Sequence, residues 1–278
     1  MQIITLTTDF GTRDWFVGTM KGVILRIAPR AAIVDITHEI PAGDIRAGAF
    51  ALAASYRFFP KGTVHVAAVD PGVGGARKAI AAQTADYFFV GPDNGVLSLA
   101  LAREKVKSVH RLENAKYFLQ PVSHTFQGRD IFAPVAAHLC RGTPIGKLGR
   151  AQKDFVRLSW PQPRVRPNRI ECQVVFLDRF GNAITNIENT SLNLKTEVVP
   201  GRRPALRSTS AFRSNAASEV FVGHKRLCRV KSFYQSVPAG QAVAVPGSSG
   251  YLEIAVNGGS AARRLGLKTG DRVNVIWR

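Results

Sequence analysis

The sequence predicts an α/β protein in which an N-terminal, mostly parallel α/β sandwich domain is followed by a small C-terminal antiparallel β-barrel domain. Three observations predict this. In the first half, apolar strand-like segments alternate with amphipathic helical segments across short polar joints, as in βαβ units. Three prolines then lie within residues 161–167, a composition typical of a linker. Beyond them, short strands separated by glycine turns favour a barrel.

The N-terminal elements alternate in chain order. Strands are expected at residues 3–9, 31–37 and 63–70. The helix expected between the first two, at residues 14–28, carries a stripe of apolar side chains at Phe16, Met20, Val23, Ile24 and Ile27. The next helix, at residues 44–59, places Ile45, Leu52 and Tyr56 on one face. Segments 78–84 and 87–92 extend the sheet, and residues 95–104 and 130–142 read as further helices, the latter ending near Gly142.

The second half of the chain lacks the alternation of strand and helix patterns seen in the first half. Strand-like segments occur at 171–187, 218–224, 241–259 and 270–278, and the short stretch 259–267 is its only helical pattern. We therefore predict an N-terminal domain at 1–160, a proline-rich linker at 161–169 and a C-terminal domain at 170–278.

Composition excludes several classes of protein. The N-terminus has no basic region followed by an apolar one, and the longest small-apolar run, residues 47–54, is too short to span a bilayer. Cys140, Cys172 and Cys228 are odd in number, far apart and without a CxxC pair. This argues against a disulfide framework or a zinc knuckle, and we expect a cytoplasmic protein without membrane attachment.

The net charge of +19, from 38 Lys and Arg against 19 Asp and Glu, raises a second hypothesis. A basic surface collects phosphates without regard to sequence, so a nucleic-acid-binding protein stays open as an alternative. Much of the excess lies in the segment 195–231, whose purpose the sequence does not reveal. No RRM, KH, zinc-finger or helix-turn-helix pattern accompanies it, so this alternative is not favoured.

Polar side chains gather where the predicted strands end, which is where ligands bind in parallel α/β sheets. The residues concerned are Asp9, Asp14, Asp70, Arg77, Asp93 and Asn94, and a loop before a helix adds His124 and Arg129.

Each has an ordinary structural alternative. Asp9 suits a turn and helix cap, Asp93 a turn, and a single histidine is more often structural than catalytic. As a set, however, an aspartate, an arginine and a histidine can orient and deprotonate a water: the arginine keeps its proton, while the histidine titrates near neutrality. Six histidines without HxH or HExxH spacing argue against a transition-metal site.

Several blocks, in order and spanning both domains, closely resemble the S-adenosylmethionine (SAM) hydroxide adenosyltransferases, the water-using relatives of fluorinase and chlorinase. The blocks are TTDFGTRDWFVGTMKGVI, DITHEIPAGDIRAGAFAL, RFFPKGTVHVAAVDPGVGGARKAIA, VGPDNGVLSL, SHTFQGRDIFAPVAAHL, DRFGNAITNI and GYLEIAVNGG. The resemblance implies hydrolysis of S-adenosyl-L-methionine to adenosine and L-methionine, without a metal or cofactor. It also implies a homotrimer with active sites between subunits.

The family's catalytic Asp-Arg-His set falls on Asp70, Arg77 and His124. Which of Asp70 and His124 is the base, and which sulfonium epimer (S or R) is the substrate, both stay open.

The resemblance also implies substrate contacts. Asp9 matches the acid that holds both ribose hydroxyls, and Asp14 and Asp178 match positions near the methionine ammonium. Asn182 matches the amide that reads the adenine edge, and Val256 would offer main chain to the adenine. Further substrate-binding positions are Phe126, Ser248, Ser249 and Glu253. The fluorinase has a Ser-Arg pair where this chain has Ser248 and Ser249, so carboxylate recognition there is in question.

Halide transfer from SAM is disfavoured. The halogenases carry a tyrosine where this chain has Asp70, and the fluorinase carries a serine where it has Gly128. A carboxylate beside the reacting carbon would repel a halide ion and accept a hydrogen bond from water. A metal-dependent phosphoesterase built on Asp9, Asp70, Asp93 and His124 is a further alternative.

Overall fold

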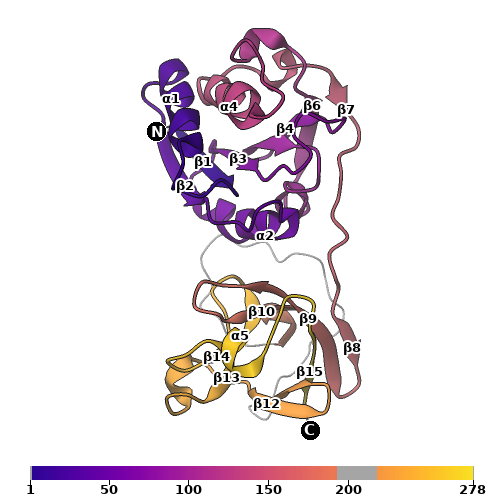
Figure 1. Cartoon of the computed structure of the whole chain (residues 1–278). Coiled ribbons are helices and arrows are strands. Elements are labelled where there is room, and N and C mark those ends of the chain that lie inside the picture. The colour runs from indigo at the N-terminus through magenta and orange to yellow at the C-terminus, as the bar shows by residue number, and fades with distance from the viewer. Residues whose placement is uncertain (1, 193–217, 278) are drawn as a thin grey trace. The chain divides into compact units, whose positions relative to one another are not determined.

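A computed structural model describes residues 2–192 and 218–277, which belong to two compact units, Met1–Ser159 and Trp160–Arg278 (Figure 1). Each unit contains one β-sheet, and the sheets differ in kind. The first combines parallel and antiparallel strands with helices, whereas the second is antiparallel and almost closed on itself. The fold class predicted from the sequence is confirmed.

The N-terminal sheet has seven strands in the order β2-β1-β3-β5-β4-β6-β7. Their bounds are β1 (Ile3–Thr8), β2 (Ala32–Thr37), β3 (Val64–Ala68), β4 (Ala79–Thr84), β5 (Phe88–Pro92), β6 (Val106–Arg111) and β7 (Ala151–Gln152). Strands β2, β1, β3 and β5 are parallel, as expected from the βαβ pattern. From β4 onward the pairing is antiparallel, because the three residues between β4 and β5 allow a hairpin but no crossover.

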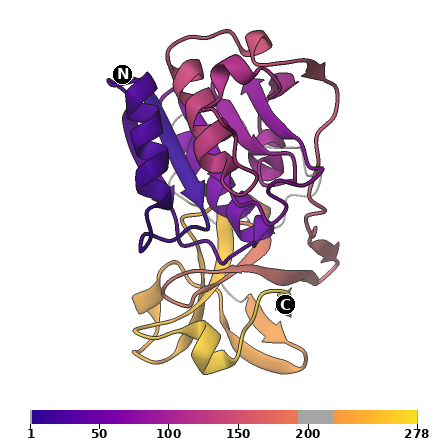
Figure 2. The same cartoon turned by 45° about the horizontal axis from the view of Figure 1, so that its top comes forward.

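Helices cover both faces of this sheet. Helices α1 (Phe16–Ile27) and α4 (Ala133–Cys140) lie on one face, and α2 (Ile45–Ser55) lies on the other beside the short α3 (Ser98–Leu101) (Figure 1). Figure 2 shows α1 and α4 side by side in front of the strands. Short turns of helix complete the chain: η1 (Tyr56–Phe58), η2 (Ala115–Tyr117), η3 (Gly128–Phe132), η4 (Ile145–Lys147), η5 (Asn189–Leu192) and η6 (Tyr234–Ser236).

Helix formation follows the sequence pattern. In α1, Val17, Met20 and Ile24 are buried against the sheet, which uses part of the predicted stripe. Helix α2 begins where the Asp44 carboxylate accepts a hydrogen bond from the Ala47 N–H at 2.9 Å. Strand β3, which follows α2 in the chain, is buried along its whole length. The sheet therefore presents its strand ends from a rigid, apolar core.

The C-terminal sheet has eight strands. Seven follow the order β12-β11-β15-β9-β10-β14-β13, and β8 pairs with β9. The bounds are β8 (Arg164–Arg166), β9 (Arg169–Leu177), β10 (Ala183–Glu188), β11 (Glu219–Val222), β12 (Lys225–Arg229), β13 (Ala242–Pro246), β14 (Tyr251–Val256) and β15 (Arg272–Ile276), with helix α5 (Ala261–Leu265) after β14. A bridge between Val230 and Ala244 joins the two ends of this order, so the sheet curls into a nearly closed barrel.

The basic segment 195–231 lies mostly outside the described residues. Its described part forms the β11–β12 hairpin, where the Glu219 carboxylate pairs with Arg226 at 3.1 Å and Arg229 at 3.3 Å. Some of its cations are thus neutralised within the hairpin.

None of the helices in the described ranges is long and apolar enough to cross a membrane.

Candidate functional site

The strand ends of the N-terminal sheet bring Asp9 and Asp70 to one edge. Asp9 directly follows β1, and Asp70 lies two residues beyond β3, which pairs with β1 in parallel register. The Asp9 carboxylate accepts a hydrogen bond from the Gly43 N–H at 2.7 Å. A Cβ placed on Gly43 would lie 3.5 Å from Cβ of Pro71, the residue after Asp70. The turn before α2 thus bridges the two strand ends.

Asp70 and Arg77 form a two-pronged ion pair. Nε of Arg77 donates to Oδ1 of Asp70 at 3.0 Å, and Nη2 donates to Oδ2. The side chains are only 8% and 12% exposed, and the Arg77 guanidinium lies 5.6 Å from the centre of the Phe132 ring. Because the fork of arginine matches both carboxylate oxygens, the Asp70 carboxylate is held in one orientation.

His124 reaches the same edge through a backbone contact. A Cβ on Gly74, midway between Asp70 and Arg77, would lie 2.3 Å from the His124 carbonyl oxygen and 3.3 Å from its Cβ. The glycine has φ of +77°, a conformation that other residues avoid. Loop 70–77 and the His124 segment therefore touch, and His124 is an exposed residue.

A buried acid holds the His124 segment in place. Asp130, in the π-helical turn η3, is fully buried and accepts a hydrogen bond from the Ser123 N–H at 2.8 Å. Nε and Nη2 of the neighbouring Arg129 also donate hydrogen bonds to the Asp130 carboxylate, at 2.6 and 2.9 Å. Sequence reasoning placed Arg129 near the site, whereas the anchoring role of Asp130 was missed. A charged residue inside an apolar helical pattern was the signal that could have found it.

A buried histidine, His38, contacts the chain next to Asp9. Nδ1 of His38 is 2.8 Å from Oγ1 of Thr8, and its Nε2 is 3.0 Å from Oδ1 of Asp35. Its carbonyl oxygen accepts a hydrogen bond from the Gly11 N–H at 2.7 Å. His38 thus holds the chain on both sides of Asp9. The sequence analysis missed it, since nothing in the spacing of a lone histidine indicates such contacts.

Two other strand-end residues have structural contacts. The Asp93 carboxylate accepts hydrogen bonds from the Val156 N–H at 2.8 Å and from Gln152 at 3.3 Å. Asn94 donates to the Val69 carbonyl at 2.9 Å, and thereby ties β5 to the end of β3. Within the described ranges, no group of three His, Cys, Asp or Glu side chains is arranged to hold a metal ion.

Phe126 is buried among aromatic side chains. Its ring centre lies 5.8 Å from that of Phe10 and 5.1 Å from that of Phe16, both edge-on, with the Arg129 guanidinium 5.3 Å away. Asp14 lies exposed in the bend before α1.

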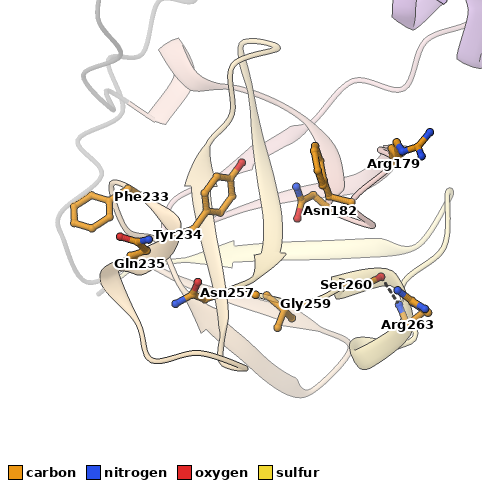
Figure 3. Close-up of a pocket in the computed structure, with 12 residues that line it drawn as sticks. Arg179, Asn182, Phe233, Tyr234, Gln235, Asn257, Gly259, Ser260 and Arg263 are labelled. Carbon is orange, nitrogen blue, oxygen red and sulfur yellow. Dashed lines mark hydrogen bonds between the residues drawn. The ribbon is translucent and has the colours of Figure 1, made fainter.

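The C-terminal unit contains a pocket of about 780 Å³ (Figure 3). Its walls come from the turn between β9 and β10, from η6, and from the segment after β14. The lining residues are Arg179, Phe180, Asn182, Phe233, Tyr234, Gln235, Val256, Asn257, Gly258, Gly259, Ser260 and Arg263. Two of the site residues predicted from the sequence, Asn182 and Val256, line this pocket.

The turn that carries Asn182 is closed by Asp178. One Asp178 oxygen accepts the Asn182 N–H at 2.8 Å, and the other accepts the side-chain Nδ2 at 2.9 Å. Gly181 is pressed against α5: a Cβ there would lie 2.0 Å from Oγ of Ser260, and its carbonyl accepts the Ala262 N–H at 2.8 Å. Asn182 therefore stands on a rigid turn.

Glu253 faces the interior of the C-terminal unit. It is 5% exposed, and the Tyr234 hydroxyl donates a hydrogen bond to its carboxylate. Burial raises the pKa of Glu253; the Tyr234 hydrogen bond opposes this, and the charge of Asp178 adds to it. The carboxylate also lies against Gly247, where a Cβ would be 2.3 Å from Oε2. Glu253 thus packs against the loop that carries Ser248 and Ser249. Of these two residues, Ser248 is exposed and Ser249 is half-buried.

Comparison with known proteins decides the family. The family models for the SAM hydroxide adenosyltransferase N-terminal and C-terminal domains match residues 4–149 and 172–274. The chain belongs to this family. The resemblance predicted from the sequence blocks is confirmed.

Members of the family with different activities are similar to the chain to different degrees. (R)-S-adenosyl-L-methionine hydrolases from Salinispora arenicola and Thermus thermophilus are both 37% identical to it, over 98% and 99% of this chain and 97% and 100% of theirs. A fluorinase from an Actinoplanes species is 28% identical over 98% of this chain and 97% of its own. A solved structure of an uncharacterized conserved protein from Thermotoga maritima is 36% identical, with a TM-score of 0.87 over 99% of this chain and 100% of that one.

Several residues that line the pocket could not be identified from the sequence. Tyr234, Arg179 and Arg263 line the pocket, yet no spacing rule pointed to them. The exposed aromatic pair Phe233 and Tyr234, in an otherwise polar stretch, is the one signal that could have done so.

Proposed function

We propose that the protein hydrolyses S-adenosyl-L-methionine to adenosine and L-methionine. The observation that carries the proposal is the Asp70–Arg77 ion pair with the His124 segment packed against its loop. It agrees with the family membership and with the greater similarity to hydrolases than to a fluorinase. Because the relatives at 37% identity are named (R)-SAM hydrolases, we further propose that the R sulfonium epimer is the preferred substrate.

The reaction needs a nucleophile more than it needs an acid. Water attacks C5′ of the ribose in line with the C5′–S bond, which breaks with its electron pair going to sulfur. Methionine leaves as a neutral thioether and takes no proton. The water loses one proton to the Asp70–His124 pair and from there to solvent. Holding the water in position and removing its proton are therefore the tasks of the protein.

The three residues divide these tasks. The Asp70 carboxylate accepts a hydrogen bond from the water, and Arg77 keeps that carboxylate in one orientation. His124 is exposed at the same edge, and we propose that it receives the proton that the water gives up. Since the departing thioether requires no Lewis acid, we propose that neither a metal nor a cofactor takes part.

The remaining family positions are proposed as substrate contacts. Asp9 would hold the ribose hydroxyls, and Asn182 and Val256 would hold the adenine. Phe126, Asp14, Asp178, Ser248, Ser249 and Glu253 complete the proposed set. The Asp9 oxygen that does not bond to Gly43 is the one we expect to meet the ribose.

Separated R and S epimers of SAM test the activity directly. Adenosine and methionine are followed by chromatography, and we expect faster turnover of the R epimer. Asp70→Asn and His124→Ala should each lower kcat by about 10²- to 10⁴-fold, the usual contribution of a general base and its partners. Asp86→Asn is the matched control: Asp86 is a carboxylate of the same unit that pairs with Lys61 at 2.9 Å in the β4–β5 turn. No adenosine from either epimer would refute the proposal, as would full activity in both site variants.

We also propose a cytoplasmic homotrimer with sites between subunits, on the family resemblance. Light scattering should then give a mass about three times the 30.2 kDa of the chain.

A further inference from the structure

Three hydrogen bonds hold the chain around Asp9. Oγ1 of Thr8, the residue before it, is 2.8 Å from Nδ1 of His38. The Gly11 N–H donates to the His38 carbonyl oxygen at 2.7 Å. The Asp9 carboxylate itself accepts the Gly43 N–H, also at 2.7 Å. The side chain and the main chain of His38 therefore fix the positions on either side of Asp9.

The direction of the Thr8–His38 hydrogen bond follows from the other contacts of these two side chains. Oγ1 of Thr8 accepts a hydrogen bond from the Phe10 N–H at 3.3 Å. Nε2 of His38 lies 3.0 Å from Oδ1 of Asp35, where an N–H is favoured because a nitrogen lone pair would face a carboxylate oxygen. In the neutral ring Nδ1 is then the acceptor, and the Thr8 hydroxyl donates to it.

Asp35 is held as a carboxylate by its other neighbour. Nζ of Lys21 lies 2.5 Å from Oδ2 of Asp35. The pKa of Asp35 is lowered: burial raises it, but hydrogen bonds from Lys21 and His38 outweigh that effect. The charged form of Asp35 is the one that keeps the proton of the imidazole on Nε2, so the order of donors and acceptors runs from Lys21 to Thr8.

The three residues have the composition of a hydrolytic triad, but the structure excludes that role. A hydroxyl, an imidazole and a carboxylate in hydrogen-bond sequence can activate the hydroxyl as a nucleophile. Thr8 and His38 are 0% and 4% exposed, so a substrate has no access to Oγ1 of Thr8. That oxygen also bonds to the Phe10 N–H. The network therefore acts on Asp9, which lies between Thr8 and Phe10.

We propose that His38 is a positioning residue: together with Asp35 and Thr8 it fixes the Asp9 carboxylate, and so sets how strongly the protein prefers ribose to a sugar without 2′ and 3′ hydroxyls. The inference rests on the proposed function, which assigns the ribose hydroxyls to Asp9. An acceptor already held in place loses little conformational freedom on binding, whereas a mobile one loses more and binds less tightly. A hydrogen bond from a hydroxyl to a carboxylate changes affinity by about 10- to 100-fold.

A matched pair of threonine variants tests the proposal. Calorimetry gives the Kd of the full chain for adenosine and for 2′,3′-dideoxyadenosine, and wild type should bind adenosine at least about 10-fold more tightly. In Thr8→Val, which removes the hydroxyl and keeps the branched shape, this preference should fall toward one. Thr5→Val is the control, because Oγ1 of Thr5 lies 2.8 Å from Nδ1 of the buried His65, a bond of the same kind earlier in the same strand. It should keep the wild-type preference.

Two substitutions of His38 extend the test. In His38→Asn the amide Oδ1 is attached to Cγ, as Nδ1 is in histidine, and can accept the Thr8 hydroxyl. His38→Leu offers no acceptor. The asparagine variant should therefore retain more of the preference for adenosine than the leucine variant. Equal preferences in the two variants would show that the hydrogen bond does not hold Asp9, and would overturn the inference even if Thr8→Val does not fold.

The outcomes separate this inference from the proposed function. A wild-type preference retained in Thr8→Val, or an equal loss in Thr5→Val, overturns the inference alone. Equal affinity of wild type for both nucleosides, in protein that hydrolyses SAM, also overturns the inference and leaves the proposed function standing. Wild-type protein that binds neither nucleoside and releases no adenosine from SAM would refute both proposals.

Discussion

Replacing Gly74 with alanine should separate His124 from the Asp70–Arg77 pair without substituting any of these three residues. The added Cβ would lie 2.3 Å from the His124 carbonyl oxygen, whereas ordinary van der Waals contact begins near 3.4 Å. One of the two loops must then move by about 1 Å. A shift of that size in a catalytic group lowers the rate by about 100-fold. We expect kcat for SAM hydrolysis to fall by that factor while adenosine affinity changes little.

Gly62→Ala provides the matched control. Gly62 has φ of +84°, close to the +77° of Gly74, but nothing lies within 4 Å of its added Cβ. Both variants therefore carry the backbone cost of alanine at positive φ, about 1 kcal/mol, and only Gly74→Ala displaces His124. Steady-state kinetics and thermal unfolding of both variants measure the two effects. Unchanged kcat in Gly74→Ala, or an equal loss in Gly62→Ala, would refute this reasoning.

Three further predictions follow from buried groups and from the site. Burial lowers the pKa of His65 to about 3, so below pH 6.5 the unfolded chain binds a proton that the fold excludes. The free energy of unfolding should fall by about 1.4 kcal/mol per pH unit from pH 6.5 toward 3 in urea titrations, and less steeply in His65→Leu. Gly128→Ser should yield no 5′-halogenated product from SAM and chloride, and should lower the unfolding free energy by about 1–3 kcal/mol, because its Cβ would lie 3.3 Å from Sδ of Met20 and 3.4 Å from Phe10. Dialysis against EDTA should leave SAM hydrolysis unchanged; activity lost on chelation and restored by a divalent cation would favour a metal enzyme.

Much of the N-terminal half was readable from local pattern. The run of β3, apolar except for His65, predicted a buried parallel strand, and the alternation around it predicted which edge would carry Asp9 and Asp70. The stripe of α1 also appears as expected from helix periodicity, and α2 begins within a residue of the predicted start at residue 44. Such signals are readable because they depend on neighbours within one turn or one strand.

Contacts between loops were not readable in this way. The Asp70–Arg77 pair spans a glycine turn whose shape depends on φ at Gly74, and His124 meets that turn from 50 residues further along the chain. Asp130 is buried because η3 packs into the core, and its partner Ser123 comes from the loop that precedes η3. No periodicity encodes these encounters.

By itself, the sequence determined the fold class, the family and the edge of the N-terminal sheet where the acidic residues collect. These follow from hydrophobic period and motif order, which are properties of the chain read locally. Only the tertiary structure decided that Asp178 gives both carboxylate oxygens to Asn182, and that Tyr234 donates to the buried Glu253. The reason is that a side chain's hydrogen-bond partner depends on which loops the packed core brings within about 3 Å, and that distance is settled by the whole fold.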